Sequence, residues 1–260
     1  MDFAAVIGTF LGFGFIIAGM IMEGGNIGQI LQITAAFIVI GGTAGAVFLS
    51  FPVSDFKIAF SLIKTVYFNE VPDLEKLIAE IVDYSQKARK EGVIVLEREA
   101  KTCSDKLLAL GLEAVADGAD PSLVKEMMET QLAQLEAKVS TGSKVFESAG
   151  GYAPTLGIIG AVMGLIQVMQ NLSDPSKLGA GIAVAFVATI YGLFVANLIT
   201  LPYSTRIKQK YQKIFTAKEM IITGILAMQA GESPALIERK LETFLLDGRK
   251  DKKGKGKEGE

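Results

Sequence analysis

The sequence lacks histidine and tryptophan and contains a single cysteine in 260 residues. A cluster of His and Cys that could hold a metal is therefore excluded. Cys103 has no partner for an intrachain disulfide, and we expect a small, buried hydrophobic side chain there. A phosphate-binding glycine loop, a nucleophile elbow and a buried acid–base pair are also missing. These absences argue against an enzyme and predict neither a cofactor nor a bound metal.

Charge is absent from four long stretches of the chain, and half of all residues are apolar. A helix that crosses a bilayer needs about 20 predominantly apolar residues. The mean hydropathy of +0.40 agrees with a membrane protein. We therefore predict an all-α, polytopic membrane protein with four transmembrane helices. The uncharged runs are Phe3–Met22, Ile27–Ser54, Ser148–Ser173 and Leu178–Thr205.

Lysine and arginine are distributed unevenly around these runs. Residues 57–144 contain 12 of them and the chain from Arg206 onward contains 13, whereas the loop between the third and fourth runs has only Lys177. Under the positive-inside rule, the long loop, the tail and both termini are expected to be cytoplasmic. The basic residues alternate with acidic ones and form no patch, which argues against nucleic-acid binding.

The long loop has the pattern of a helical domain. Asp73 is positioned to cap a helix that ends near Gly92, and Asp120–Pro121 and Ser233–Pro234 are further helix starts. After Asp120 the apolar stripe is expected to contain Leu123, Met127, Leu132, Leu135 and Val139. The predicted divisions are transmembrane helices 1 and 2 (1–54), a cytoplasmic helical domain (55–147), transmembrane helices 3 and 4 (148–205), cytoplasmic C-terminal helices (206–247) and a disordered charged tail (248–260).

The interior of every uncharged run lacks Asp, Glu, Lys and Arg. A proton or cation path through a membrane normally requires an ionisable group. Either the chain transports nothing, or a partner supplies the carboxylate. Close helix packing is expected from small residues, which are Gly8, Gly12 and Gly19 in the first run and Gly157, Gly160 and Gly164 in the third.

Three residues of the third and fourth runs are candidates for function. Thr189 lies near the predicted middle of the membrane, where its hydroxyl either bonds its own helix or lines a wet path. Pro154 frees the carbonyl of Gly150, so we expect a kink or a backbone that can shift there. Pro202, at the inner end of the fourth run, acts in the same way or simply ends the helix.

Several segments resemble the flagellar stator subunits of the MotA/PomA family. Three segments are similar to the third and fourth transmembrane helices of that family. They are YAPTLGIIGAVMGLI, NLSDPSKLG and AVAFVATIYGLFVANLITLP. RKEGVIVLERE at 89–99 is similar to its cytoplasmic stretch, and the likeness covers essentially the whole chain. The resemblance implies an ion-conducting stator subunit of the bacterial inner membrane, which converts ion-motive force into torque on the rotor.

The same resemblance implies the partners and the site. A MotB-like protein with one membrane helix would bring an aspartate into the membrane, surrounded by a homo-oligomeric ring, a pentamer, in membrane lipid. Pro154 and Pro202 match the prolines that couple ion flow to cytoplasmic movement. Without the family, the charged residues of the loop would be a solvated helix face. The residues that match contacts to the rotor protein FliG are Arg89, Lys90, Glu97, Arg98 and Glu99.

The resemblance also bears on the transported ion. Sodium-type members have threonine where this chain has Ala161, beside the shared Thr189, and some have another in place of Ala188. A methyl group cannot coordinate sodium, which needs oxygen ligands. The sequence therefore favours H+ over Na+.

Other protein classes compete with this interpretation. ExbB/TolQ-type proton-driven energisers are related but have three spans, whereas four are expected here. A membrane scaffold that conducts nothing would need no partner with a single span and an intramembrane aspartate.

Overall fold

The computed structural model describes residues 2–68 and 71–245, which form helices and no strands. They divide into two compact units. Among the described residues, the membrane unit comprises 2–68 and 138–210, and the core unit comprises 71–137 and 211–245. Helices α8 (Pro121–Gln170) and α10 (Leu201–Gln229) each contribute to both units. The predicted all-α class is confirmed, and the predicted tail at 248–260 lies outside the described residues.

Within residues 2–68 and 71–245, four helices are long and apolar enough to cross a membrane, which confirms the predicted number. The first is α1 (Phe3–Met22), and the third is the part of α8 within the membrane unit. The second and fourth are composite, because a π-helical segment interrupts each of them. The second span consists of α2 (Ile33–Ala36), η2 (Phe37–Gly41) and α3 (Gly42–Ser50). The 3-10 turn η1 (Ile27–Ile30) precedes it. The fourth span consists of α9 (Pro175–Phe194), η3 (Val195–Thr200) and the start of α10. After the second span, α4 (Val53–Phe68) also belongs to the membrane unit.

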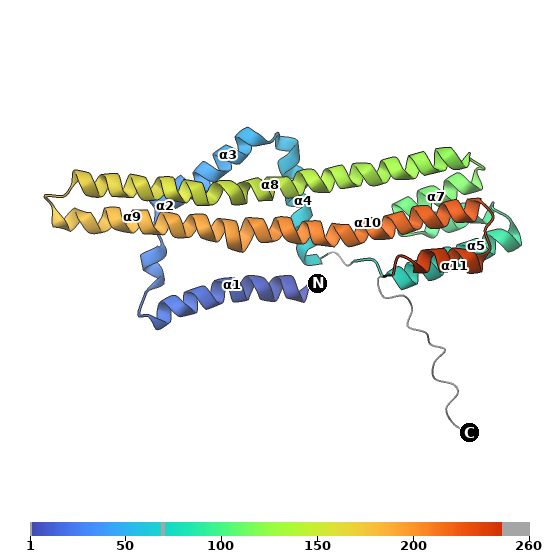
Figure 1. Cartoon of the computed structure of the whole chain (residues 1–260), viewed down its shortest axis with the longest axis horizontal. Coiled ribbons are helices and arrows are strands. Elements are labelled where there is room, and N and C mark those ends of the chain that lie inside the picture. The colour runs from blue at the N-terminus through green and yellow to red at the C-terminus, as the bar shows by residue number, and fades with distance from the viewer. Residues whose placement is uncertain (1, 69–70, 246–260) are drawn as a thin grey trace, which may run out of the picture. The chain divides into compact units, whose positions relative to one another are not determined.

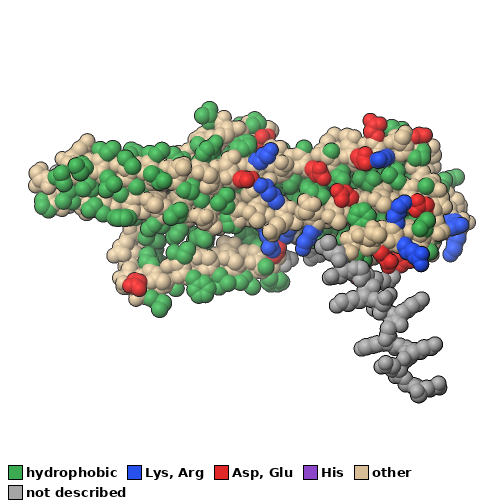
Figure 2. Space-filling view, in the orientation of Figure 1, with side chains coloured by type: hydrophobic (Ala, Val, Ile, Leu, Met, Phe, Trp, Pro, Cys, Tyr) green, Lys and Arg blue, Asp and Glu red, His purple; other side chains and the backbone are tan. Residues whose placement is uncertain are grey.

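Large apolar side chains remain exposed along the third span, among them Ile158, Val162 and Ile166, each at least half exposed. Figure 2 shows such side chains covering α8 and α9 toward their connecting turn, with almost no charge among them. In water this surface would be unfavourable, whereas lipid tails solvate it at no cost. Helices α8 and α9 lie side by side, as Figure 1 shows.

The core unit is a helical bundle with a continuous apolar interior. Its elements are α5 (Leu74–Glu91), α6 (Val95–Thr102), α7 (Lys106–Ala116), α11 (Pro234–Glu242) and the unit's parts of α8 and α10. Leu108, Met128 and Ile225, from three different helices, are fully buried in one cluster. Cys103 packs against that cluster but is only partly buried, whereas a buried side chain was expected, and its partial burial raises the pKa of its thiol.

The helix ends of the core unit agree with the local sequence signals. The Asp73 carboxylate accepts hydrogen bonds from the amides of Glu75 and Lys76, and α5 ends at Gly92, whose φ of +88° favours glycine. The Ser233 hydroxyl accepts from the amide of Leu236 at the start of α11. The structure confirms these caps. The sequence could predict them because each cap depends on only a few neighbouring residues.

The apolar stripe expected after Asp120 was partly wrong. Leu123 and Met127 are exposed, whereas their neighbours Val124 and Met128 are fully buried. The step of five residues from Met127 to Leu132 departs from the helical period, whereas Val124, Met128 and Leu132 keep it. Leu132 and Val139 are buried as expected, so the error is confined to the first turns of the helix.

Candidate functional site

The third and fourth spans are in backbone contact through glycines. A Cβ added to Gly164 of α8 would lie 2.6 Å from the carbonyl oxygen of Gly181 on α9. At Gly160 it would lie 2.6 Å from the Ala188 Cβ, and at Gly157 it would lie 3.0 Å from the Ala188 carbonyl oxygen. Only glycine permits this approach, so the expected packing role of these three residues is confirmed. We call this contact the glycine seam.

The glycines of the first span behave differently. Gly8 and Gly19 have no atom within 4 Å of an added Cβ, and at Gly12 only a Leu198 methyl lies near, at 3.3 Å. Within the chain, the first span therefore does not use its glycines for close packing. The prediction had grouped them with the third span because a glycine pattern alone does not show which face is covered.

Thr189 lies beside the glycine seam, and its Cα is 3.4 Å from the position of a Cβ on Gly157. Its hydroxyl donates to the carbonyl of Ala185, at 3.1 Å between the oxygens. This is the local hydroxyl-to-carbonyl bond that the sequence left open as one of two alternatives. Thr189 and Ala161 are both half-buried. The Thr189 hydroxyl oxygen still has a lone pair available to a ligand.

Pro154 and Pro202 lie in neighbouring parts of the contact between α8 and the fourth span. A Cβ on Gly192 would lie 2.6 Å from the Ala153 carbonyl oxygen and 3.1 Å from the Pro154 Cα. One turn earlier, a Cβ on Gly150 would lie 2.5 Å from Leu201, the residue before Pro202. The structure therefore brings Pro154 and Pro202 into one stretch of the helix pair, which their separation of 48 residues in the sequence did not indicate.

Neither proline ends its helix. Helix α8 continues through Pro154, and α10 continues past Pro202. The π segment η3 lies directly before Pro202, where the Thr200 hydroxyl donates to the carbonyl of Val195 at 3.0 Å. A π segment widens the helix by one residue, and such segments often lie at functional sites. The sequence analysis missed it, because a π segment has no compositional signal of its own.

The charged residues of the second candidate site lie in the core unit, at the end of α5 and in α6. Arg89 and Lys90 are exposed in the last turn of α5, and Glu97 and Arg98 are exposed on α6. Between the two helices the apolar Ile94 is also exposed, at 75%. These residues form an accessible surface of mixed charge with an apolar side chain among them.

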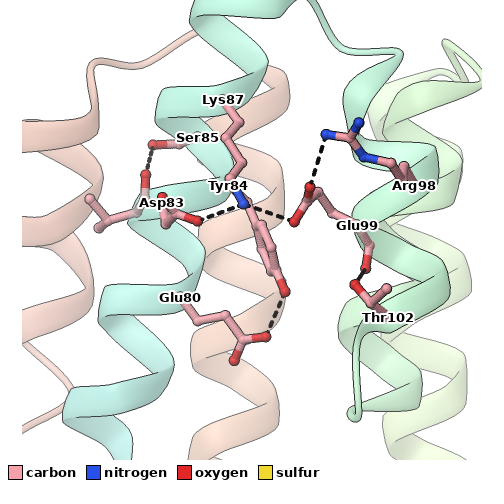
Figure 3. Close-up of polar contacts among 9 residues, drawn as sticks. Glu80, Asp83, Tyr84, Ser85, Lys87, Arg98, Glu99 and Thr102 are labelled. Carbon is pink, nitrogen blue, oxygen red and sulfur yellow. Dashed lines mark hydrogen bonds and ion pairs between the residues drawn. The ribbon is translucent and has the colours of Figure 1, made fainter.

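Glu99 differs from the other four because it holds α5 and α6 together (Figure 3). Its carboxylate accepts from Lys87 Nζ at 2.9 Å, and only 14% of its side chain is exposed. Lys87 also pairs with Asp83 at 3.0 Å. The Glu99 and Asp83 carboxylates together raise the pKa of Lys87 above its ordinary value. The Glu99 carboxylate therefore stabilises the packing of α5 against α6 in the core unit.

A further ionic cluster lies at the start of the first span, and the sequence analysis missed it. The Asp2 carboxylate accepts from Arg206 Nη2 and lies 3.1 Å from Lys210 Nζ. It also caps α1 through the amide of Ala5, while the Asp2 amide donates to the Tyr67 carbonyl. Arg206, followed by Lys210, lowers the pKa of Asp2 far below its ordinary range. The sequence signal for this cluster is Asp2 directly before the first span, together with Arg206 and Lys210 after the fourth span.

The fold and these sites define a class of protein. It is a multi-pass helical membrane protein whose third and fourth spans form a tight glycine-packed pair, with uncharged spans and a charged helical unit attached to them. Among the described residues, no group of three or more Cys, Asp and Glu side chains is placed to hold a metal.

Comparison with known proteins agrees with this class. Residues 99–220 match the profile of the MotA/TolQ/ExbB proton channel family. Motility protein A of Bacillus subtilis is 32% identical over 94% of this chain and 91% of its own. Chemotaxis protein PomA of Vibrio alginolyticus is 30% identical over 96% of this chain and 98% of its own. The structure of C. jejuni MotAB matches with a TM-score of 0.88 and 28% identity over 94% of this chain and 96% of that chain.

The chain therefore belongs to the MotA/TolQ/ExbB proton channel family, in its motility protein A group. The resemblance inferred from the sequence is confirmed, and so is the four-span helical architecture.

Proposed function

We propose that this protein is an ion-conducting stator subunit of the bacterial flagellar motor and not an enzyme. The observation that carries the proposal is similarity along nearly the whole chain to motility protein A and to a MotAB structure with four corresponding helices. An ExbB/TolQ-type energiser would have three spans, whereas this chain has four. A non-conducting scaffold would leave the family relationship unexplained.

The uncharged spans support a role for a partner. A MotB-like protein with a single span would supply the aspartate that this chain lacks, because a proton path needs an ionisable group within the membrane. We place the chain in the inner membrane with the core unit and both termini in the cytoplasm, since the long loop and the tail hold 25 of the 26 basic residues. A pentameric ring around the partner is part of the proposal.

Protons are the proposed ion. The side chain of Ala161 has no oxygen that could coordinate sodium. The carboxylate of the partner would take up a proton next to the third and fourth spans. Pro154 and Pro202 would then transmit the change, because each removes a backbone hydrogen bond from a helix of the same closely packed pair.

Torque would be delivered through the exposed residues of α5 and α6. Four charged side chains are exposed and can pair with complementary charges on the rotor protein FliG. They are Arg89, Lys90, Glu97 and Arg98. Such exposed pairs are individually weak and sensitive to salt. Glu99 would contribute by fixing the angle between the two helices through Lys87.

Swimming by a strain without its own stator tests this proposal. The strain should express the protein together with the single-span partner encoded beside it, with sodium present or absent and then with the proton gradient collapsed. We expect motility without sodium and none without the proton gradient. Sodium-dependent motility would contradict the proposed ion, and no motility under any condition would contradict the stator role.

A further inference from the structure

A cavity of about 270 Å³ opens between the start of α1, the end of α4 and the start of α10, all within the membrane unit. One part of its wall is apolar and includes Ala5, Gly8 and Leu198. The other part contains Arg206 and the hydroxyl-bearing Tyr67. The cavity thus combines a surface suited to hydrocarbon with one suited to a polar group.

The polar part of the cavity contains positive charge next to a carboxylate. Arg206 and Lys210 both pair with the carboxylate of Asp2. Lys210 Nζ additionally donates to the carbonyls of Thr65 and Val66, which hold it in the helix packing. Arg206 Nε is buried and has no hydrogen-bond partner among the described residues. A buried donor without a partner is unfavourable, so an acceptor at this position would be stabilised.

Aromatic hydroxyls continue this polar part. The hydroxyls of Tyr67 and Tyr203 are 2.9 Å apart, and the Thr9 hydroxyl lies 3.4 Å from that of Tyr67. Tyrosine is enriched where membrane hydrocarbon meets water. The position agrees, because α1 begins at Phe3 and the wall residues that α1 contributes belong to its first two turns. The cavity therefore lies at the depth of lipid headgroups.

We propose that this cavity binds an anionic phospholipid, with the phosphate on Arg206 and the tyrosine hydroxyls and an acyl chain leaving over Gly8 and Leu198. Basic pockets between transmembrane helices are suited to anionic headgroups. The guanidinium fork matches phosphate oxygens, and Nε would gain its missing acceptor. A soluble phosphate compound would use the same polar groups, but it would leave the apolar wall without an occupant.

This inference does not depend on ion conduction, and its test needs no motility. Pro202 also lines the cavity. The bound lipid would consequently contact α10 at the residue that we propose for coupling.

Native mass spectrometry of the purified protein tests the inference. The protein should be exchanged into dioleoylphosphatidylglycerol or dioleoylphosphatidylcholine and then washed with detergent. We expect one phosphatidylglycerol retained per chain and no phosphatidylcholine. Equal retention of the two lipids, or retention of neither, would overturn the proposal. Displacement of the lipid by soluble glycerol phosphate at matched phosphate concentration would overturn the lipid as the source.

A pair of glycine variants locates the site. Gly8→Leu places a side chain in the cavity, where an added Cβ meets no atom within 4 Å. Gly14→Leu is the matched control, because Gly14 is equally open, lies on the same helix and is not part of the cavity wall. We expect Gly8→Leu to lose the retained lipid and Gly14→Leu to keep it. The same retention in both variants would place the lipid elsewhere.

An arginine variant keeps the test decisive if Gly8→Leu does not fold. Arg206→Lys preserves the charge that pairs with Asp2 but removes the guanidinium fork and Nε. We expect about tenfold weaker retention, as for loss of one charge-assisted hydrogen bond. Lys208→Gln, two residues away and paired with Glu147 outside the cavity, should retain lipid normally. Unchanged retention in Arg206→Lys would overturn the assignment of the phosphate site.

Discussion

Among single residues, the five charges assigned to the rotor contact separate into two kinds. Glu97 is exposed and pairs with Lys101 one helical turn away, which lowers the pKa of the Glu97 carboxyl. Glu99 is mostly buried and pairs with Lys87 on another helix. The sequence could identify both as charged but could not distinguish them, because burial depends on α5 packing against α6.

This difference in burial predicts different effects of the same substitution at Glu99 and at Glu97. Glu99→Gln removes the acceptor that joins the two helices, and we expect the melting temperature to fall by a few degrees. Glu97→Gln should leave the melting temperature unchanged and reduce swimming, with a smaller difference from the parent at high salt because salt screens the exposed pair. Circular dichroism melts and swimming assays with equal membrane abundance measure the two effects. Equal destabilisation by both variants would contradict the separation.

Asp2 gives a prediction for pH dependence. Arg206 and Lys210 hold the Asp2 pKa below its ordinary value of 3.8. Its contribution to stability is therefore complete above about pH 4 and is lost as the pH falls toward the lowered folded-state pKa.

Asp2→Asn should reduce the free energy of unfolding by about 2 kcal/mol at neutral pH, because Arg206 and Lys210 both lose their ion pair with the Asp2 carboxylate. Thermal melts in detergent at about pH 7 and about pH 3 should show the gap between variant and parent narrowing in acid. A gap that stays constant with pH would show that the ionised carboxylate is not the cause.

At the scale of helices, the sequence predicted those features that depend on neighbouring residues. Asp73 and Gly92 mark the two ends of α5, and Ser233 marks the start of α11, because capping requires only a few adjacent groups. The π segment before Pro202 and the contact of Gly150 with Leu201 were not predicted. A π segment has no compositional signal of its own, and the contact of Gly150 with Leu201 depends on how two distant helices meet, which no local pattern specifies.

The glycine seam predicts a clear difference between two glycines of α8. Gly164→Ala would place a methyl group 2.6 Å from a backbone oxygen, which cannot move without separating the helices. We expect a loss of about 2 kcal/mol in the free energy of unfolding, as for other overpacked sites. Gly151→Ala is the control, since its added methyl meets no atom within 4 Å.

Thermal stability in detergent and abundance in membranes would measure this effect. Gly151→Ala should be neutral or stabilising by up to ~1 kcal/mol, because alanine favours a helix. If the two alanine variants were equally stable, the close backbone contact would not contribute to the packing of these spans.

For the whole molecule, the uncharged spans determine what the protein can do alone. The sequence places no Asp, Glu, Lys or Arg inside the four uncharged runs. An ion would therefore meet no ionisable group on its way across.

The purified chain in liposomes should consequently conduct no protons. A pH-sensitive dye inside the vesicles would report uptake under an applied potential. Co-reconstitution with the single-span partner should produce uptake, and the partner with its intramembrane aspartate replaced by asparagine should not. Flux through the chain alone would contradict the requirement for a partner.

The core unit is discontinuous along the chain, and this has a consequence during synthesis. Residues 71–137 leave the ribosome before residues 211 onward, which supply Ile225 and Leu241 to the same cluster. Roughly 70 residues separate the two parts, which takes about 4–15 s at ~5–20 residues per second. During that interval the nascent helices α5 to α7 expose an apolar face that only the last part of the chain can cover. Premature termination after the fourth span would leave that face uncovered permanently and direct the product to proteolysis.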